Sequence, residues 1–163
     1  MNIWVTRMFT HTGPRRGETF AESSFAKQIA LIEAGEIRPV VRAGNLESLR
    51  TWADVRDAVR AYHLLVTAGL PRGNAYNIGG SHTCTVGEML QHLISLSSMR
   101  ESIEVEVDPL RLRPLDANLQ VPDVSKFREA TGWVPEIPFE QTMQDLLDYW
   151  RQRVATQGAY SGR

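Results

Sequence analysis

The sequence predicts a mixed α/β fold, because segments with apolar residues at helical spacing alternate with short β-prone runs. We expect four to five helices and four strands, and no internal repeat, low-complexity block or linker divides the chain. At 163 residues the chain fits one compact domain with a substantial core. Residues 1–154 are expected to form this single α/β unit, and the small, polar residues 155–163 are expected to fray.

The first three elements are predicted from their residue composition and from the glycine and proline residues that end them. The opening strand begins near Ile3 in a run of β-branched and aromatic residues and stops at the Gly13-Pro14 break. A helix is expected over residues 20–35, where apolar side chains recur at helical spacing up to a terminal glycine. A short strand at residues 39–41 then ends at Gly44-Asn45.

The central elements have clear boundaries. Residues 54–68 predict a helix with an apolar stripe, and its first residue, an aspartate, is placed to act as the N-cap. Residues 75–78 predict a strand. A third helix over residues 86–96 follows, with Thr85 or Thr83 as its cap.

The last third of the chain is expected to contain one strand and two helices. Residues 103–107 alternate apolar and acidic side chains, which is typical of a half-exposed strand. Residues 111–118 predict an irregular loop, residues 125–131 a short helix, and residues 139–151 a final helix.

Composition and charge exclude several classes of function. The formal net charge of −1 creates no global field, so neither nucleic acid nor an anionic membrane is expected as a partner. No apolar run approaches the roughly 20 residues that span a bilayer, and no signal peptide pattern is present, so we expect a cytoplasmic protein. The single Cys84 excludes an internal disulfide, and the histidines lack ligand spacing, so no metal site is expected. We interpret Trp52, Trp133 and Trp150 as packing residues.

Four blocks carry a resemblance to a known family. They are F-T-H-T-G-P-R-R at 9–16, G-N-L-E-S-L-R at 44–50 leading into D-V-R-D at 54–57, A-Y-N-I-G at 75–79, and R-P-L-D at 113–116 followed by G-W-V-P at 132–135. The chain resembles the C-terminal part of an extended short-chain dehydrogenase/reductase of the NAD-dependent epimerase/dehydratase family. The most similar branches are the GDP-mannose 4,6-dehydratases and the GDP-4-keto-6-deoxymannose reductases.

This resemblance implies an extended Rossmann-type fold that lacks its N-terminal glycine-rich half. No G-x-x-G-x-x-G or G-x-G-x-x-G occurs, and neither Lys27 nor Lys126 follows a tyrosine by four positions, so the family's Tyr-x-x-x-Lys pair is absent as well. The intact enzyme would use NADP or NAD, whereas we expect this chain alone to bind neither. We expect an oligomer, or a chain that requires the missing half, because helices that cover the absent sheet would expose their apolar stripes.

Arginines are the first candidates for binding a nucleotide-diphospho-sugar, because a diphosphate needs fixed cationic groups. Arg50 resembles the arginine of the family's G-N-L-x-x-x-R-D segment, which implies a substrate contact. Thr51 stands in place of the aspartate in that segment, and this is expected to loosen the contact. Arg113 and Asp116 resemble the family's R-P-x-D, which implies a diphosphate contact for Arg113 and a ribose contact or a loop-fixing role for Asp116. Arg111 is expected to face solvent.

The opening loop supplies further candidates. Thr10 stands where the family usually places an asparagine that contacts the substrate, and its hydroxyl replaces only one of the amide's hydrogen bonds. His11 resembles the family's histidine, with proton transfer and a plain loop hydrogen bond as alternatives. Pro14 is expected to line the nicotinamide side of the crevice. Arg15 either reaches a phosphate or stays solvated, and the same alternatives hold for the neighbouring arginine.

Three more residues complete the predicted substrate site. Gln28 lies on the helix that carries a substrate-contacting basic residue in the dehydratase branch, although a solvated helix face is the alternative. Asn45 and Leu46 are expected to contact the guanine side of the ligand through backbone groups.

The leading functional hypothesis is the substrate-binding part of an enzyme that resembles GDP-mannose 4,6-dehydratase, with GDP-mannose or a derivative as ligand. A reductase or another nucleotide-sugar epimerase/dehydratase fragment is the alternative within the same scaffold. A non-catalytic, degenerate ligand-binding or interaction module is the alternative of another class. The sequence leaves open whether this chain alone is an enzyme, because it lacks both the cofactor motif and the Tyr-x-x-x-Lys pair.

Overall fold

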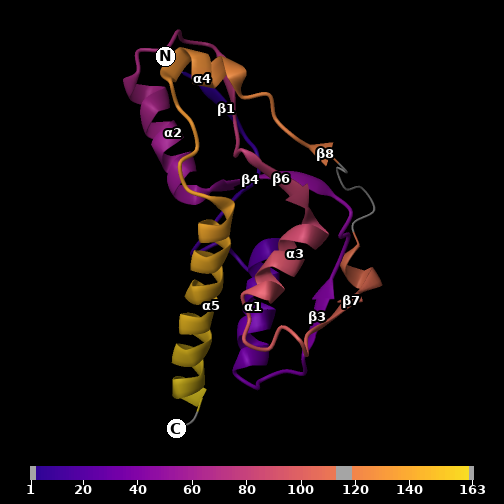
Figure 1. Ribbon diagram of the computed structural model, residues 1–163. Coiled ribbons are helices and arrows are strands. Elements are labelled where there is room, and N and C mark those ends of the chain that lie inside the picture. The colour runs from indigo at the N-terminus through magenta and orange to yellow at the C-terminus, as the bar shows by residue number, and fades with distance from the viewer. Residues whose placement is uncertain (1–2, 113–118, 162–163) are drawn as a thin grey trace.

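Residues 3–112 and 119–161 are described by the computed structural model in Figure 1, which confirms the mixed α/β fold. The helices are α1 (Ala21–Glu33), α2 (Val55–Thr67), α3 (Val86–Ser95), α4 (Ser125–Thr131) and α5 (Phe139–Ser161), with a 3-10 turn at Pro109–Arg111. The strands are β1 (Val5–Met8), β2 (His11–Thr12), β3 (Val40–Ala43), β4 (Leu49–Asp54), β5 (Ala75–Ile78), β6 (His82–Thr85), β7 (Glu104–Val107) and β8 (Leu119–Gln120).

The five predicted helices are all present close to their expected ranges. Asp54 caps α2 by accepting a hydrogen bond from the Arg56 backbone N–H at 2.7 Å. Thr85, one of the two predicted caps of α3, forms a reciprocal capping box with Glu88. The last helix, α5, runs to Ser161 and therefore extends past the predicted boundary at Val154.

The strands pair in three small groups. β1 pairs with β5 and β3 pairs with β7, both in parallel, as is usual for strands of a Rossmann-type sheet. β4 is the centre of the third group, which also includes β2, β6 and β8. β2 lies within the segment predicted for the opening strand, whereas β4, β6 and β8 were not predicted. β6 and β8 are short and largely polar, and β4 shows no clear alternation of apolar and polar residues, so their pairing with one another produces the extended conformation.

The arrangement in space has two ends joined through β4, as Figure 1 shows. At one end α2 and α4 lie beside β1, and at the other end α1 and α3 lie between the β3–β7 pair and α5. Each end has its own core cluster of buried apolar residues. The larger cluster joins α1, α3 and α5 to β3 and β4, and the smaller one joins α2, α4 and β5. Trp52, Trp133 and Trp150 are all buried, which confirms their assignment to packing.

Two buried aspartates connect the ends. Asp54, at the end of β4, accepts a hydrogen bond from the Thr142 hydroxyl of α5 at 2.8 Å. Asp57 of α2 accepts hydrogen bonds from the backbone N–H groups of Glu136 at 3.0 Å and Ile137 at 2.9 Å. These bonds satisfy buried polar groups and fix the segment that leads into α5 against α2.

Part of the α2 surface is apolar and uncovered. Val59, Tyr62 and Val66 recur at helical spacing and are 61%, 38% and 62% exposed. Ala58 and Leu65, on the adjacent face of the helix, are buried. An exposed stripe is what the sequence predicted for a helix that covers only part of a larger sheet.

Candidate functional site

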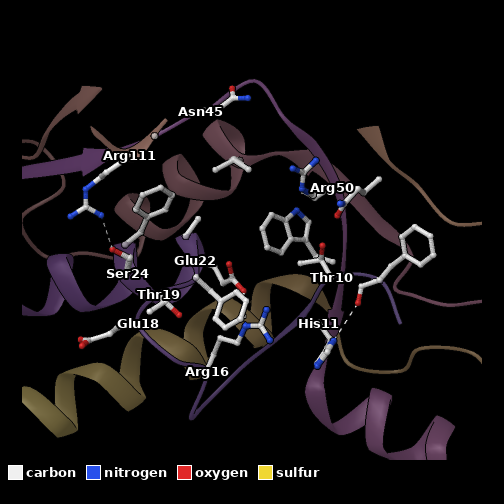
Figure 2. A pocket seen from close by; sticks show the side chains of 18 of the residues that line it. Thr10, His11, Arg16, Glu18, Thr19, Glu22, Ser24, Asn45, Arg50 and Arg111 are labelled. Atoms are coloured by element: carbon white, nitrogen blue, oxygen red, sulfur yellow. Dashed lines mark hydrogen bonds and ion pairs between the residues drawn. The ribbon is translucent and has the colours of Figure 1, made fainter. Parts of the chain in front are cut away.

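A cavity of about 860 Å³ lies where the opening loop, the start of α1, β4 and the segment after β7 meet (Figure 2). The size is in the range of pockets that bind small molecules and cofactors. Four of the residues predicted for the substrate site line this cavity: Thr10, His11, Asn45 and Arg50. Tertiary structure therefore brings together residues that lie up to forty positions apart in the sequence.

The sheet holds the opening loop at the cavity wall. The Phe9 backbone N–H donates to the Ile78 carbonyl at 2.9 Å, and the Thr10 carbonyl accepts from the Ala53 N–H at 3.0 Å. These bonds fix the backbone of Thr10, whose hydroxyl side chain borders the cavity. His11 Nδ1 lies 3.3 Å from the Phe9 carbonyl oxygen, which is a local hydrogen bond of the kind expected as its alternative role.

β4 carries Arg50 to the cavity. Its register aligns Arg50 with Cys84 of β6 on one side and with Gln120 of β8 on the other. The guanidinium Nη1 donates to the Leu49 carbonyl at 3.1 Å. The neighbouring Thr51 is buried, and its hydroxyl is 3.0 Å from that of Thr83. Thr51 therefore belongs to the sheet contact between β4 and β6.

Asn45 shapes the turn that leads into β4. Its side-chain amide donates to the Ser48 hydroxyl at 2.9 Å, and its side-chain oxygen accepts from the Glu47 N–H at 2.9 Å. Both ends of the amide are therefore used within the turn, and a ligand contact through the backbone of Asn45 stays a prediction.

Arg111 is exposed, as the sequence predicts, and it also lines the cavity. Its Nη1 lies 3.3 Å from the Ser24 hydroxyl of α1, and its Nε lies 3.6 Å from Asp108. Gly44 permits this approach, because a Cβ at that position would lie 2.6 Å from the Arg111 carbonyl oxygen. The sequence did not predict the contact with Ser24, because it joins segments far apart in the chain.

Arg16, the second arginine of the opening loop, pairs in the cavity with Glu22, a residue that the sequence analysis did not single out. Arg16 Nε lies 3.2 Å from Glu22 Oε1, and the Arg16 guanidinium stacks 3.4 Å from the centre of the Phe20 ring. Glu22 is 3% exposed. Burial raises the pKa of the Glu22 carboxyl, and its own backbone N–H, Arg16 and Thr12 oppose this rise. A sequence signal did exist, because Glu22 precedes Phe25 and Ile29 on the buried face of α1.

Four predicted residues are not brought to the cavity. Arg15 has a positive φ of 74° and an exposed side chain, and Pro14 precedes it in the same turn. Gln28 bonds to the backbone of Arg42 through both ends of its amide, at 2.9 and 3.2 Å. Leu46 packs against the larger core cluster. Their roles in binding stay predictions.

Arg113 and Asp116, the other two predicted substrate residues, lie outside the described residues. Within the described part of the chain, the cavity wall contains four arginines and two glutamates: Arg7, Arg16, Arg50, Arg111, Glu18 and Glu22. The excess of fixed positive charge favours an anionic ligand.

Residues 3–112 and 119–161 contain no cluster of side chains suited to a metal ion, and none of their helices is long and apolar enough to cross a membrane.

Comparison with known proteins identifies the family. The GDP-mannose 4,6 dehydratase family matches residues 1–146. A GDP-6-deoxy-D-mannose reductase of Pseudomonas aeruginosa is 28% identical, over 93% of this chain and 49% of the relative. A GDP-mannose 4,6-dehydratase of Yersinia enterocolitica is 27% identical, over 86% of this chain and 44% of the relative. The structure of RMD from Pseudomonas aeruginosa complexed with NADPH has a TM-score of 0.81 at 27% identity, over 93% of this chain and 49% of that one.

The chain thus spans about half the length of the curated relatives that it matches. The matched half has the parallel strand pairs of the Rossmann-type fold and includes the whole cavity described above. This chain belongs to the GDP-mannose 4,6-dehydratase family of extended short-chain dehydrogenases/reductases.

Proposed function

We propose that this chain forms the substrate-binding portion of a nucleotide-sugar-modifying enzyme, with GDP-mannose or a derivative as its ligand. The observation that carries the proposal is the cavity, whose described wall has four arginines among hydroxyl and backbone hydrogen-bonding groups. A nucleotide sugar combines a charged diphosphate with neutral polar rings. Fixed guanidinium groups bind the diphosphate, and hydrogen-bonding side chains bind the neutral rings.

NADP or NAD remains the proposed cofactor of an intact enzyme, because the related RMD structure is a complex with NADPH. The described residues of this chain do not fit a dinucleotide. Gly79-Gly80 follows β5 but leads into strand β6, whereas a pyrophosphate site needs a glycine-rich turn that opens a helix. A Cβ at Gly80 would lie 1.6 Å from the Trp52 carbonyl oxygen, so this glycine serves the packing of two strands.

Two further proposals concern the association of the chain with other chains and its location in the cell. The exposed apolar stripe of α2, formed by Val59, Tyr62 and Val66, supports either self-association or contact with a further half of the sheet. A cytoplasmic location stays a proposal from the sequence.

Titration calorimetry with GDP and GDP-mannose tests the binding function. Arg50→Ala is expected to weaken both ligands by about 10- to 100-fold, because a charge-assisted hydrogen bond contributes about 1.5–3 kcal/mol. Arg42→Ala is the matched control, because Arg42 is exposed on β3 and is not among the described residues that line the cavity. If the unaltered chain bound neither ligand at millimolar concentration, the proposal would be wrong.

A reductase is a second candidate, supported by the match of a GDP-6-deoxy-D-mannose reductase over 93% of this chain. Adding GDP-4-keto-6-deoxymannose as a third ligand separates the branches. Binding of the keto sugar clearly tighter than that of GDP-mannose favours the reductase, and the reverse order favours the dehydratase.

A further inference from the structure

The start of α1 places a buried carboxyl group inside a cavity that otherwise favours anions. Glu22 lines the cavity although it is only 3% exposed, so it meets little bulk solvent. In Figure 2 its carboxyl group lies near Arg16, whereas Arg111 lies with Ser24 on one side of the cavity and Arg50 lies on the other. A carboxyl group at this position requires a physical reason, because burial disfavours its charged form.

The polar atoms around Glu22 are incompletely satisfied. Among the described residues, Glu22 Oε1, Arg16 Nε and Thr12 Oγ1 have no well-aligned hydrogen-bond partner, and all three atoms are buried. The contact of 3.2 Å between Arg16 Nε and Glu22 Oε1 is an ion pair without hydrogen-bond alignment. Buried polar atoms in native proteins are normally hydrogen-bonded. Polar atoms that lack a hydrogen-bond partner beside a cavity therefore indicate that a bound molecule supplies it.

The chemistry of the group restricts that partner. A phosphate would be repelled by the Glu22 carboxylate, and the separate positions of Arg50 and Arg111 offer it a better site. A neutral hydroxyl group suits Glu22, because it can donate to an ionised carboxylate or accept from a protonated carboxyl. Burial raises the pKa of Glu22, which makes the protonated form more accessible than for an exposed glutamate.

We propose that Glu22, oriented by Arg16, binds a hydroxyl group of the sugar part of the ligand and so determines selectivity for a nucleotide sugar over the free nucleotide. This inference rests on the proposed function, because it assumes that the cavity binds a nucleotide sugar. A site built to hydrogen-bond a hydroxyl group discriminates strongly against a ligand that lacks it, because its own buried polar groups then stay unpaired.

The test measures the affinities for GDP and GDP-mannose and compares their ratio between variants. Glu22→Leu is expected to lower the preference for GDP-mannose over GDP by about tenfold, which is the loss of one hydrogen bond to a charged group. Glu22→Gln keeps a hydrogen-bonding side chain of the same shape and should restore most of the preference. Glu36→Gln is the matched control, since Glu36 is exposed just beyond the end of α1 and is not among the described residues that line the cavity. Its ratio should not change.

The ratio also separates binding from folding, because a partly unfolded variant loses apparent affinity for both ligands equally. An unchanged ratio in Glu22→Leu overturns this inference while leaving the proposed function intact. A wild-type chain with equal affinity for GDP and GDP-mannose overturns it as well. If the wild-type chain binds neither ligand, the proposed function is wrong and the inference falls with it.

Discussion

The two ends of helix α1 each carry a buried or partly buried glutamate, in opposite environments. Glu33, in the last turn, accepts hydrogen bonds from Arg151 at 2.7 and 2.8 Å and from the Ser97 hydroxyl at 2.7 Å. These bonds, those from Arg151 above all, lower the pKa of Glu33. Glu22, in the first turn, has one ion pair and a raised pKa. Both carboxylate oxygens of Glu33 accept hydrogen bonds, whereas Oε1 of Glu22 has no hydrogen-bond partner among the described residues.

The difference separates a residue that stabilises the fold from one that is available to a ligand. Arg151 also donates to the Leu96 carbonyl at 3.0 Å, so the Glu33 network joins α1, α5 and the end of α3. Within the described part of the chain, Glu22 forms an ion pair with Arg16 only, its Oε1 has no hydrogen-bond partner, and it lines the cavity. Functional sites commonly retain polar groups that reduce stability, and other contacts offset the cost.

The largest effect on stability is expected when the paired end is broken. Glu33→Ala should lower the free energy of unfolding by about 2–3 kcal/mol, because it removes a bidentate pair and leaves Arg151 partly buried without its main partner. Urea unfolding followed by circular dichroism measures this change. Glu36→Ala serves as the control, because Glu36 is exposed just beyond the same helix end. A loss below about 0.5 kcal/mol, the level of a surface pair, would show that the network contributes little.

An intermediate effect is expected in the pH dependence of stability, where the two glutamates act with opposite sign. The folded pKa of Glu33 is below its ordinary value of 4.5, so its contribution is present above that pH and is lost as the pH falls through the folded pKa. The folded pKa of Glu22 is above 4.5, so its effect on stability is most favourable below that pH and declines as the pH rises through the folded pKa.

Unfolding free energies between about pH 3 and pH 8 test this contrast, since stability changes with pH wherever the two states bind different numbers of protons. Glu33→Gln should flatten the profile below pH 4.5, and Glu22→Gln should remove a decline above pH 4.5. Two variants with the same change of slope would contradict the proposed difference between the ends.

The smallest effect on stability is expected at the cavity end. Glu22→Leu should change the free energy of unfolding at pH 7 by less than about 1 kcal/mol, or increase it, because an apolar side chain replaces a buried and incompletely paired charge. The same urea experiment measures it. A loss comparable to that of Glu33→Ala would mean that the ion pair with Arg16 is structural and would weaken the contrast.

Much of the fold follows from local patterns in the sequence. The helices were predicted from apolar spacing and from caps such as Asp54 and Thr85, because both signals act within a few residues. Strand β4 was missed, because Thr51 and Asp54 are polar residues that become buried only through contacts with β6 and α5. The resemblance of short motifs to a known family was confirmed over residues 1–146.

The candidate site was predicted in part, and the division has a physical cause. Motif resemblance identified Thr10 and Arg50, because each belongs to a short motif of residues adjacent in the chain, and both line the cavity. It missed Glu22, whose place in the site depends on its burial beside Arg16, and it did not predict that the exposed Arg111 reaches Ser24 of α1.

By itself, therefore, the sequence determined the helices, the fold class and the family, since spacing, capping and motifs are local properties of the chain. Only the tertiary structure decided which polar groups share one cavity and which are satisfied by partners. The burial of a side chain and the partners of its polar atoms depend on residues from other parts of the chain. These surroundings distinguish Glu22 from Glu33, although both lie on the same helix.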